Sequence, residues 1–350
     1  MIRAGTQFDP IVVVDRYAEE EGSAVREAML AALPPEEPVQ WLLDPMQAYL
    51  GRPAKLLRPL LCIATGRILG SHDSEVLPLA AAIELLHNQF LIQDDLADES
   101  TSRRGAPTLH LDVGPALALT ASVGLGLHAL RLLHDSNRWL GPRLADQVTH
   151  EFMSMLRRTL QGQATELGWI RDKVTDLEPH HYLEMVALKT CWYTTIHPLR
   201  IGALVATAGA VDLDRFVQLG LHLGTAFQIQ DDLLNLEGEF HAYGKEHAGD
   251  LREGKRTLML IHLLRTATGD DRRFMDRYLS MSQAERNPEV LAKVLELMER
   301  YDSLAFARAY SSRIADEAER AFERLFVGAP PSRDLDFISA LVPYMIRRRR

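Results

Sequence analysis

The sequence has little cysteine, no excess of positive charge and no apolar run at its start. Its 350 residues contain two cysteines, Cys62 and Cys191, which are too few for a disulfide framework and fit a reducing compartment. Lys and Arg number 39 against 48 Asp and Glu, a net charge of −9, whereas a general nucleic-acid binder needs a basic surface. The opening residues, MIRAGTQFDP, lack the apolar core of a signal peptide. We therefore expect a cytoplasmic protein that binds no nucleic acid.

Long uncharged stretches are scarce as well. Residues 113–130 form an 18-residue stretch without a formal charge, which just reaches the length of a transmembrane helix. The stretch is rich in glycine, contains Ser122 and His128, and is closed by Asp112 and Arg131. We therefore predict a buried core helix rich in small residues, and no transmembrane segment.

Strand-like alternation of apolar and polar residues is nearly missing, and the short run Ile11–Val14 is the clearest strand-like segment. Apolar residues instead recur three or four positions apart, as in Leu79, Ile83 and Leu86. This is the period of an amphipathic helix. The sequence therefore predicts an all-α fold.

No obvious linker divides the chain. The proline-bearing segments 32–38 and 328–333 are short loops, and no period of a repeat protein is visible. Residues 238–254 are polar and glycine-bearing between two apolar helical segments, which is typical of a functional loop. We therefore predict a single helical domain over residues 1–350, with short irregular ends.

One motif occurs twice. The sequence FLIQDD at 90–95 returns as FQIQDD at 227–232, so each copy carries a pair of carboxylates. Residues four, seven and eleven positions apart share one face of a helix. The two faces that this spacing predicts are His87, Leu91, Asp94 and Asp98 on the first helix, and Gly224, Gln228, Asp231 and Asn235 on the second.

Two such helices facing each other would bring four or five carboxylates around one cavity mouth. Carboxylates held so closely resist joint ionisation unless a cation neutralises them. Oxygen ligands without His or Cys suit Mg²⁺, which binds through a few carboxylates together with substrate phosphate. A solvated helix end explains one such motif, but it does not explain two copies in the same Phe and Gln context.

Basic residues surround the two motifs despite the negative net charge. Those nearest to them are Lys55, Arg58, Arg103, Arg104, Lys189, Lys245 and Lys255. Lys55 and Arg58 stand three apart, on one face of a predicted helix. Each of these residues alone would be a surface charge. Together with the aspartates they indicate two polyanion sites, one bridged by metal and one held directly by Lys and Arg.

In their order along the chain, these motifs resemble those of the trans-isoprenyl diphosphate synthases, the polyprenyl synthetase family. The resemblance spans residues 51–257. Its landmarks are DDLAD at 94–98 followed by RRG at 103–105, GQATE at 162–166, KT at 189–190, FQIQDD at 227–232, GK at 244–245 and DLREGKRT at 250–257. The resemblance implies a helical bundle of the isoprenoid synthase type with a central cavity. It also implies a homodimer, and three Mg²⁺ ions per active site for which Mn²⁺ can substitute.

The resemblance further implies a role for each matching residue. The contacts to isopentenyl diphosphate would be Lys55, Arg58, His87 and Arg104. The contacts to the allylic diphosphate would be Arg103, Lys189, Thr190, Lys245 and Lys255, with Phe227 and Gln228 lining the site. The metal ligands would be Asp94, Asp95, Asp98, Glu166, Asp231 and Asp232. The residues taking a direct part in catalysis would be Asp94, Asp95, Asp98, Arg103, Lys189, Thr190, Asp231, Lys245 and Lys255.

The chain departs from the family pattern at three positions. Leu56 stands where the family's GGKRLRP segment has a basic residue. Asn235 stands where many members have Asp, which leaves a neutral oxygen donor in the second motif. Glu166 stands where Asp is common, and its longer side chain can still reach a water bound to a metal ion. None of these changes removes an indispensable charge.

The implied reaction is ionisation of an allylic diphosphate (dimethylallyl, geranyl or farnesyl), condensation with isopentenyl diphosphate, and loss of a proton. Phe90 lies one helical turn before Asp94, about 6 Å along the axis, and the preceding Gln89 is not aromatic. One ring instead of two predicts a pocket floor of intermediate depth. The expected product is therefore geranylgeranyl diphosphate, C20, and the alternative is farnesyl diphosphate or a longer chain.

Three other functions fit parts of the sequence. A class I terpene cyclase shares the fold and the metal chemistry, but its second metal motif has Ser or Thr where Asn235 stands. A cyclase also has no use for the basic residues assigned to isopentenyl diphosphate. A catalytically idle partner subunit is consistent with Leu56 and Asn235. A His/Asp phosphohydrolase rests on the pairs His72-Asp73 and His134-Asp135, which lack a second metal-binding histidine.

Overall fold

The structure is a computed structural model that describes residues 9–34, 38–237 and 248–347. In these ranges the only strands are the two-residue β1 (Ser102–Arg103) and β2 (Ala106–Pro107). The first helices are α1 (Pro10–Ala31), η1 (Val39–Leu43), α2 (Asp44–Leu50), α3 (Leu57–Ile68), α4 (Asp73–Ala97), α5 (Leu109–Val113), α6 (Pro115–Asp135) and α7 (Asn137–Arg171). The later ones are α8 (Pro179–Val186), η2 (Ala187–Ile196), α9 (His197–Ala206), η3 (Leu213–Phe216), α10 (Val217–Glu237), α12 (Gly249–Glu253), α13 (Leu258–Thr266), α14 (Gly269–Ser280), α15 (Pro288–Arg300), α16 (Ser303–Leu325) and α17 (Arg333–Arg347). The predicted all-α fold is confirmed.

The strand-like run at residues 11–14 lies inside α1. Pro10 occupies the first helical position, where a missing N–H group costs nothing. The carboxylate of Asp9 accepts the N–H of Ile11 at 3.0 Å and so satisfies one of the free donors at the helix start. This local cap, together with packing of α1 against α17 and α4, overrides the β preference of the branched side chains.

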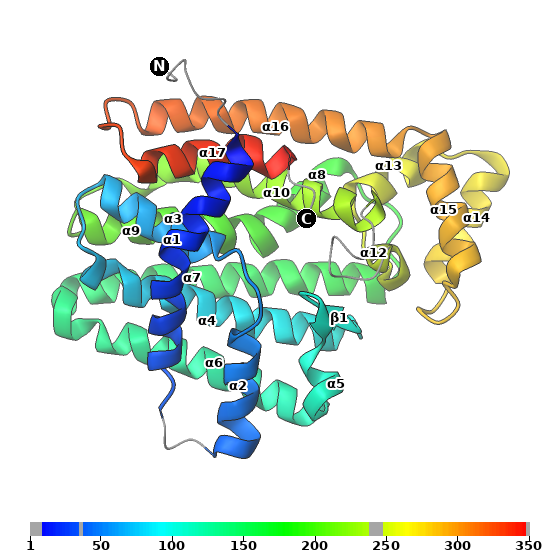
Figure 1. Ribbon diagram of the computed structural model, residues 1–350. Helices are drawn as coiled ribbons and strands as arrows, with labels where there is room; N and C mark the ends of the chain where they lie inside the picture. The colour runs from blue at the N-terminus through cyan, green and yellow to red at the C-terminus, as the bar shows by residue number, and fades with distance from the viewer. Residues whose placement is uncertain (1–8, 35–37, 238–247, 348–350) are drawn as a thin grey trace.

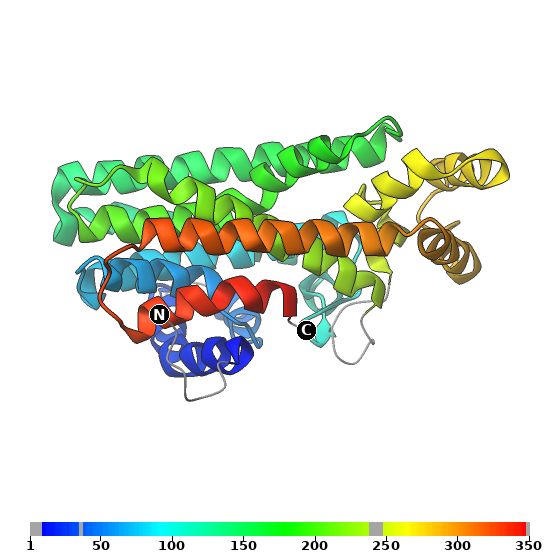
Figure 2. The same cartoon turned by 90° about the horizontal axis from the view of Figure 1, so that it is seen from above.

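The long helices pack side by side, with α4 against α6 and α3, and with α10 against α16 and η2 (Figures 1 and 2). Buried apolar residues form two clusters, and α10 contributes Leu223 to one and Ile229 to the other. Likewise, α16 contributes Ala318 to the first cluster and Ala307 to the second. These two helices therefore connect the two parts of the core.

The first acidic motif lies at the C-terminal end of α4, and the backbone there makes a sharp stop. Glu99 is in the left-handed region at φ +53°, a conformation that is uncommon outside glycine. The N–H of Ser100 returns to the carbonyl of Asp95 at 3.0 Å, in the manner of a helix-terminating Schellman turn. Asp94 and Asp98 therefore stand at a fixed helix end.

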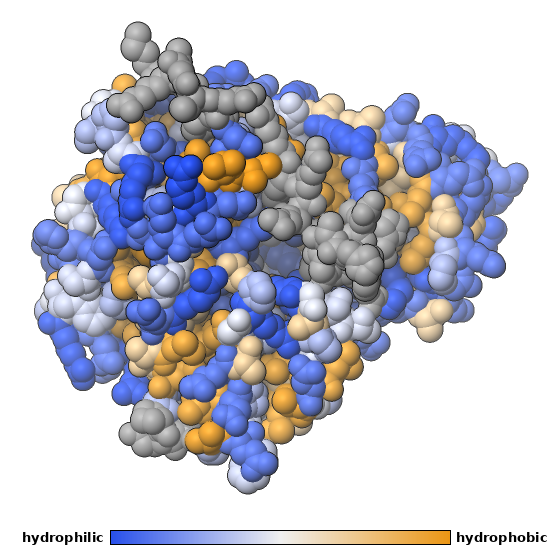
Figure 3. Space-filling view, in the orientation of Figure 1, coloured by the Kyte–Doolittle hydropathy of each residue, from blue (hydrophilic) through white to orange (hydrophobic). Residues whose placement is uncertain are grey.

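The expectation of a buried core helix at residues 113–130 is wrong for one face of α6. Ala121, Leu125 and Ala129 are buried against the rest of the protein. The opposite face carries apolar side chains that are 43–61% exposed, namely Leu119, Val123, Leu127 and Leu130. Hydrophobic residues are correspondingly visible on the lower part of the molecule, where α2, α5 and α6 lie (Figure 3).

Two helices of the described chain are long and apolar enough to cross a membrane by length and composition alone, α4 and α6. Core helices of soluble proteins pass the same test. The most apolar window of α4 is 67% buried within the protein and that of α6 is 44% buried. The two helices are therefore weak candidates for membrane spans.

Candidate active site

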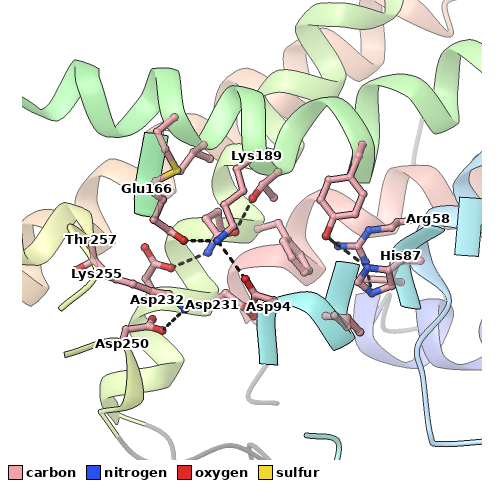
Figure 4. Close-up of a pocket in the computed structure, with 18 of the residues that line it drawn as sticks. Arg58, His87, Asp94, Glu166, Lys189, Asp231, Asp232, Asp250, Lys255 and Thr257 are labelled. Carbon is pink, nitrogen blue, oxygen red and sulfur yellow. Dashed lines mark hydrogen bonds and ion pairs between the residues drawn. The ribbon is translucent and has the colours of Figure 1, made fainter. Parts of the chain in front are cut away.

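A cavity of about 320 Å³ lies where α4, η2 and α10 meet the start of α3, the β1–β2 hairpin and the segment after α12. The sequence-predicted residues that line it are Lys55, Arg58, His87, Asp94, Arg103, Arg104, Glu166, Lys189, Thr190, Phe227, Gln228, Asp231, Asp232 and Lys255. Figure 4 shows Arg58 and His87 grouped at one side of this cavity, apart from Asp94, Glu166 and Lys189. The cavity therefore has two differently charged parts.

The predicted face of α4 turns toward the cavity. His87, Leu91 and Asp94 line it, as expected from residues spaced by four and seven positions on one helix. Asp98 lies in the adjoining recess, where its carboxylate accepts a hydrogen bond from the Lys255 ammonium at 2.6 Å. Gln163 donates to the carboxylate of Asp94 at 3.2 Å.

Asp95 lies elsewhere. Its side chain is 1% exposed and does not line the cavity, because a neighbouring residue on a helix points about 100° away. The Arg103 guanidinium donates to the Asp95 carboxylate at 2.7 Å and lies 3.6 Å from Asp94. In this position Asp95 orients Arg103, so its expected place among the metal ligands has no support from the geometry.

A chain of hydrogen bonds fixes the second acidic helix. The Thr190 hydroxyl donates to the Gln228 side-chain oxygen at 2.8 Å, and the Gln228 amide donates to Asp232 at 2.7 Å. The Tyr182 hydroxyl donates to the other oxygen of Asp232 at 2.7 Å. Burial, together with the negative charge of Asp250, raises the pKa of Asp232 well above its ordinary value. Both Asp231 and Asp232 line the cavity, and Asp232 is held by Tyr182 and Gln228.

The helix that carries Lys189, Thr190 and Tyr193 is a π-helix, η2. Such segments are rare and are frequent at functional sites. Two glycines allow neighbouring helices to approach its backbone. A Cβ atom on Gly162 of α7 would lie 2.2 Å from the backbone nitrogen of Lys189. A Cβ atom on Gly224 of α10 would lie 2.8 Å from the Cα atom of Cys191. The position of Lys189 therefore depends on backbone contact from both sides.

Two lysines occupy the acidic part of the cavity. The Lys189 ammonium contacts Glu166 and lies 3.6 Å from Asp94. The Lys255 ammonium lies 2.6 Å from both Asp98 and Glu253, and 3.8 Å from Asp250. Burial alone would lower the pKa of Lys255, but these carboxylates raise it well above its ordinary value. Both lysines are therefore charged.

The donor set fits a hard divalent cation. Burial, and then the negative charge of Asp94, raises the pKa of Asp98, as is expected of carboxylates gathered without a metal ion. In the described ranges no three His, Cys, Asp or Glu side chains are arranged to hold a metal ion. Lys189, Lys255 and Arg103 each lie within 4 Å of one of these carboxylates. Oxygen atoms of this kind are the usual ligands of Mg²⁺.

The other part of the cavity is cationic. The Arg58 guanidinium donates to the Tyr193 hydroxyl at 2.8 Å and lies 3.2 Å from the Nε2 atom of His87. Burial and the charges of Arg58 and Arg104 hold the pKa of His87 well below its ordinary value, so the imidazole is neutral. The buried Nε atom of Arg58 has no hydrogen-bond partner among the described residues. This arrangement can receive an anion.

Contrary to the prediction from the sequence, Lys55 and Arg58 do not lie on one helix. Lys55 precedes α3, and Leu56 between Lys55 and Arg58 is left-handed at φ +55°. The expected common helical face is therefore wrong, although both basic side chains line the cavity. Arg104 (φ +57°) and Gly105 (φ +75°) form the two-residue turn of the β1–β2 hairpin, for which positive φ is required in a type I′ turn.

The remaining predicted site residues are Lys245 and Phe90. Lys245 lies outside the described residues. Phe90 does not line the cavity; it packs edge-on against Tyr193, with ring centroids 5.7 Å apart. Since Tyr193 does line the cavity, Phe90 contacts the cavity wall from behind.

Some lining residues had no assigned role in the predicted site, although Asp250, Arg256 and Thr257 lie in the motif at 250–257. The others include Glu84, Leu91, Tyr182, Met185, Val186 and Tyr193. Leu91 was predicted on the helical face that carries Asp94, but it was given no role there. Tyr182 and Tyr193 stand near Lys189 in sequence, but only the packing of η2 and α8 turns them toward the cavity.

Comparisons with known proteins agree with this geometry. The family model described as "Polyprenyl synthetase" matches residues 39–298. Geranylgeranyl diphosphate synthase of Saccharolobus solfataricus is 28% identical over 77% of this chain and 84% of its own length. Geranylfarnesyl diphosphate synthase of Aeropyrum pernix is 36% identical over 61% of this chain and 67% of its own length.

A solved structure extends the likeness to the whole fold. Polyprenyl synthase from Caulobacter crescentus, crystallised with calcium and isoprenyl diphosphate, superposes with a TM-score of 0.84 at 24% identity. The alignment covers 100% of both chains. At this identity the likeness shows a shared fold.

Proposed function

Because the chain belongs to the polyprenyl synthetase family and is a trans-prenyltransferase, we propose that it condenses isopentenyl diphosphate with an allylic diphosphate in the presence of Mg²⁺. The observation that carries this proposal is the division of one cavity into a cationic part and a part with paired aspartates and lysines. Two diphosphates could then be held in two ways, one by Arg and Lys alone and one through a cation.

The cationic part would hold isopentenyl diphosphate. Arg58 offers a buried N–H group without a partner among the described residues, and an arginine can bind phosphate oxygens with two parallel hydrogen bonds. Lys55 and Arg104 line the same cavity, and the charge of Arg104 helps to lower the pKa of His87. The neutral His87 would donate a hydrogen bond to the same anion without adding charge.

The acidic part would hold the allylic diphosphate. Asp94, Asp98 and Asp231 would hold Mg²⁺, which as a Lewis acid stabilises the charge that develops on the departing diphosphate. Lys189, Lys255 and Arg103 add fixed positive charges that need not reorganise during the reaction. We propose three Mg²⁺ ions with Mn²⁺ as a substitute, and a supporting role for Glu166 through its contact with Lys189.

The allylic carbocation needs a dry wall without strong nucleophiles. Leu91, Met185 and Val186 line the cavity, and the Thr190 hydroxyl is engaged with Gln228. These groups would exclude water while isopentenyl diphosphate attacks. The proton lost afterwards would be taken by the departed diphosphate.

The proposal is tested by incubating the protein with isopentenyl diphosphate, Mg²⁺ and each allylic starter in turn. The expected products are longer isoprenyl diphosphates, identified by mass spectrometry. A cyclase would release inorganic diphosphate and a hydrocarbon without consuming isopentenyl diphosphate. An idle subunit would give no product with any starter, and either result would contradict the proposal.

Arg58→Ala, Lys55→Ala and His87→Ala are expected to raise the KM for isopentenyl diphosphate much more than the KM for the allylic substrate. For Arg58 the increase should be about 10- to 100-fold, which corresponds to the loss of a hydrogen bond to a charged group. Steady-state kinetics with each substrate varied in turn measure the difference, with the exposed Arg215→Ala as control. An effect on the allylic KM alone would mean that the two anion sites are exchanged.

We propose geranylgeranyl diphosphate as the product. The relatives from Saccharolobus solfataricus and Aeropyrum pernix are named for products of different length. The depth of the pocket would therefore determine the chain length of the product. Phe90 supports the cavity-lining Tyr193, one helical turn from Asp94. Phe90→Ala is expected to lengthen the product, because the missing ring leaves space below the aspartates. Chromatography of the dephosphorylated products measures this, and Phe90→Tyr should retain the original length. An unchanged product with Phe90→Ala would remove Phe90 from the determinants of chain length.

We further propose that the chain is one domain over residues 1–350 and forms a homodimer through the open face of α6. This face is a continuous apolar stripe at helical spacing, and such patches mark interaction surfaces. Val123→Glu is expected to yield a monomer in sedimentation velocity, whereas Val12→Glu on the exposed face of α1 should leave the dimer intact. A monomeric wild-type protein would exclude the dimer. The free, buried Cys62 and Cys191 support a cytoplasmic location.

A further inference from the structure

The turn between α14 and α15 contacts both the end of α4 at Asp98 and the segment that precedes Lys255. Helices α14 and α15 stand at the side of the molecule, next to the start of α16 (Figures 1 and 2). Their connecting turn, residues 281–287, carries Gln283 and the buried Arg286. Gln283 lines the recess that also contains Asp98 and Lys255.

The first contact of this turn is with the end of α4. Gln283 donates its side-chain amide to the backbone carbonyl of Asp98 at 3.2 Å. The last carbonyl groups of a helix have no partner within the helix, and Glu99 turns the chain away at φ +53°. Gln283 therefore satisfies a carbonyl of the residue whose carboxylate pairs with Lys255.

The second set of contacts is with the segment that carries Lys255. At the end of α14, the Tyr278 hydroxyl donates to the Leu251 carbonyl at 2.5 Å. In the turn itself, Arg286 donates to the Arg252 carbonyl at 3.0 Å. Gly254 is at φ +80°, and a Cβ atom there would lie 2.4 Å from an Arg286 nitrogen. The turn therefore packs closely on Arg252 and Gly254, which lie three residues and one residue before Lys255.

The two segments that the turn contacts are also joined by the ion pair between Asp98 and Lys255. Asp98 is attached to the turn through its carbonyl, Lys255 is attached through its preceding residues, and their side chains lie 2.6 Å apart. Neither Gln283 nor Arg286 lines the main cavity, so neither is a catalytic residue. Their contacts restrict where the Asp98 carboxylate and the Lys255 ammonium can stand relative to each other.

We propose that the α14–α15 turn is a positioning element for the allylic diphosphate site, with Gln283 as the residue that holds the end of the first acidic helix. This inference rests on the proposed function and deepens it. Loss of the Gln283 hydrogen bond would let the end of α4 move while Lys255 stays in place. Binding of a diphosphate with Mg²⁺ at this site would weaken, whereas the isopentenyl diphosphate site at the other end of the cavity would be unaffected.

The test is Gln283→Met, which keeps the length of the side chain and removes the donor. The KM for the allylic diphosphate and the Mg²⁺ concentration for half-maximal rate are expected to rise by about 2- to 10-fold, the factor that one neutral hydrogen bond supplies. The KM for isopentenyl diphosphate should not change. Tyr278→Phe, which removes the hydrogen bond on the Lys255 side, should give the same pattern, and the exposed Gln47→Met is the matched control.

A second measurement does not depend on turnover. The thermal stabilisation of each protein by Mg²⁺ with inorganic pyrophosphate should be smaller for Gln283→Met than for the wild type and for Gln47→Met. Equal stabilisation, or an equal increase in the KM of both substrates, would overturn the inference. If the wild type formed no product at all, the proposed function would fail, while the stabilisation by pyrophosphate would still decide the role of Gln283.

Discussion

Asp94→Ala and Asp231→Ala are expected to lower kcat by at least about a hundred- to a thousandfold while leaving the helical content unchanged. Removal of one group that stabilises developing charge costs this much in other enzymes. Each aspartate lines the cavity, and the adjacent aspartate is not placed to replace it: Asp95 is turned toward Arg103 and Asp232 is engaged by Tyr182 and Gln228.

Steady-state assays and circular dichroism measure the two parts of this prediction. The exposed Asp316→Ala is the matched control and should retain full activity. Removal of divalent cations with excess chelator should abolish the activity of the wild type, and added Mg²⁺ should restore it. Full turnover in the presence of chelator would contradict the assignment of these aspartates to metal ions.

Lys255→Met is expected to abolish most activity and to lower the stability of the metal-free protein by about 3–5 kcal/mol, the usual cost of breaking a buried ion pair from one side. The side chain of Lys255 is 13% exposed and lies within 4 Å of Asp98, Glu253 and Asp250. Its removal leaves three carboxylates without that cation. Mg²⁺ should therefore restore part of the lost stability.

Urea unfolding with and without Mg²⁺ measures this effect. Lys293→Met removes an equivalent charge from a surface pair whose lysine side chain is 39% exposed, and it should change stability by less than about 1 kcal/mol. If Lys255→Met unfolded at the same urea concentration as the wild type, the carboxylates around Lys255 would have another source of neutralisation.

Helical spacing predicted the part of the site that one helix presents. His87, Leu91 and Asp94 lie on one face of α4 and line the cavity together, because the period of a regular helix fixes their directions. The same rule could have separated Asp95 from Asp94. Family motifs suggested that both belong to the metal site, whereas the geometry turns them to different partners.

The remaining features depend on breaks in regular structure and on distant packing. The left-handed Leu56 carries no recognisable sequence signal, since it is a large apolar residue in a conformation typical of glycine. Residues 113–130 read as a core helix by composition, but only tertiary packing determines which face stays open. Gln283 lies 185 positions from Asp98 and in no motif, so no local pattern could connect the two.

The lysine–aspartate pairs have a thermodynamic consequence for ligand binding. Lys189 lies near Asp94, and Lys255 is paired with Asp98. A divalent cation competes with the lysines for the carboxylates, and a diphosphate competes with the carboxylates for the lysines. Each ligand would therefore free the group that the other one needs, and we expect their binding to be positively cooperative. By linkage, the factor by which the metal ion tightens the diphosphate equals the factor by which the diphosphate tightens the metal ion.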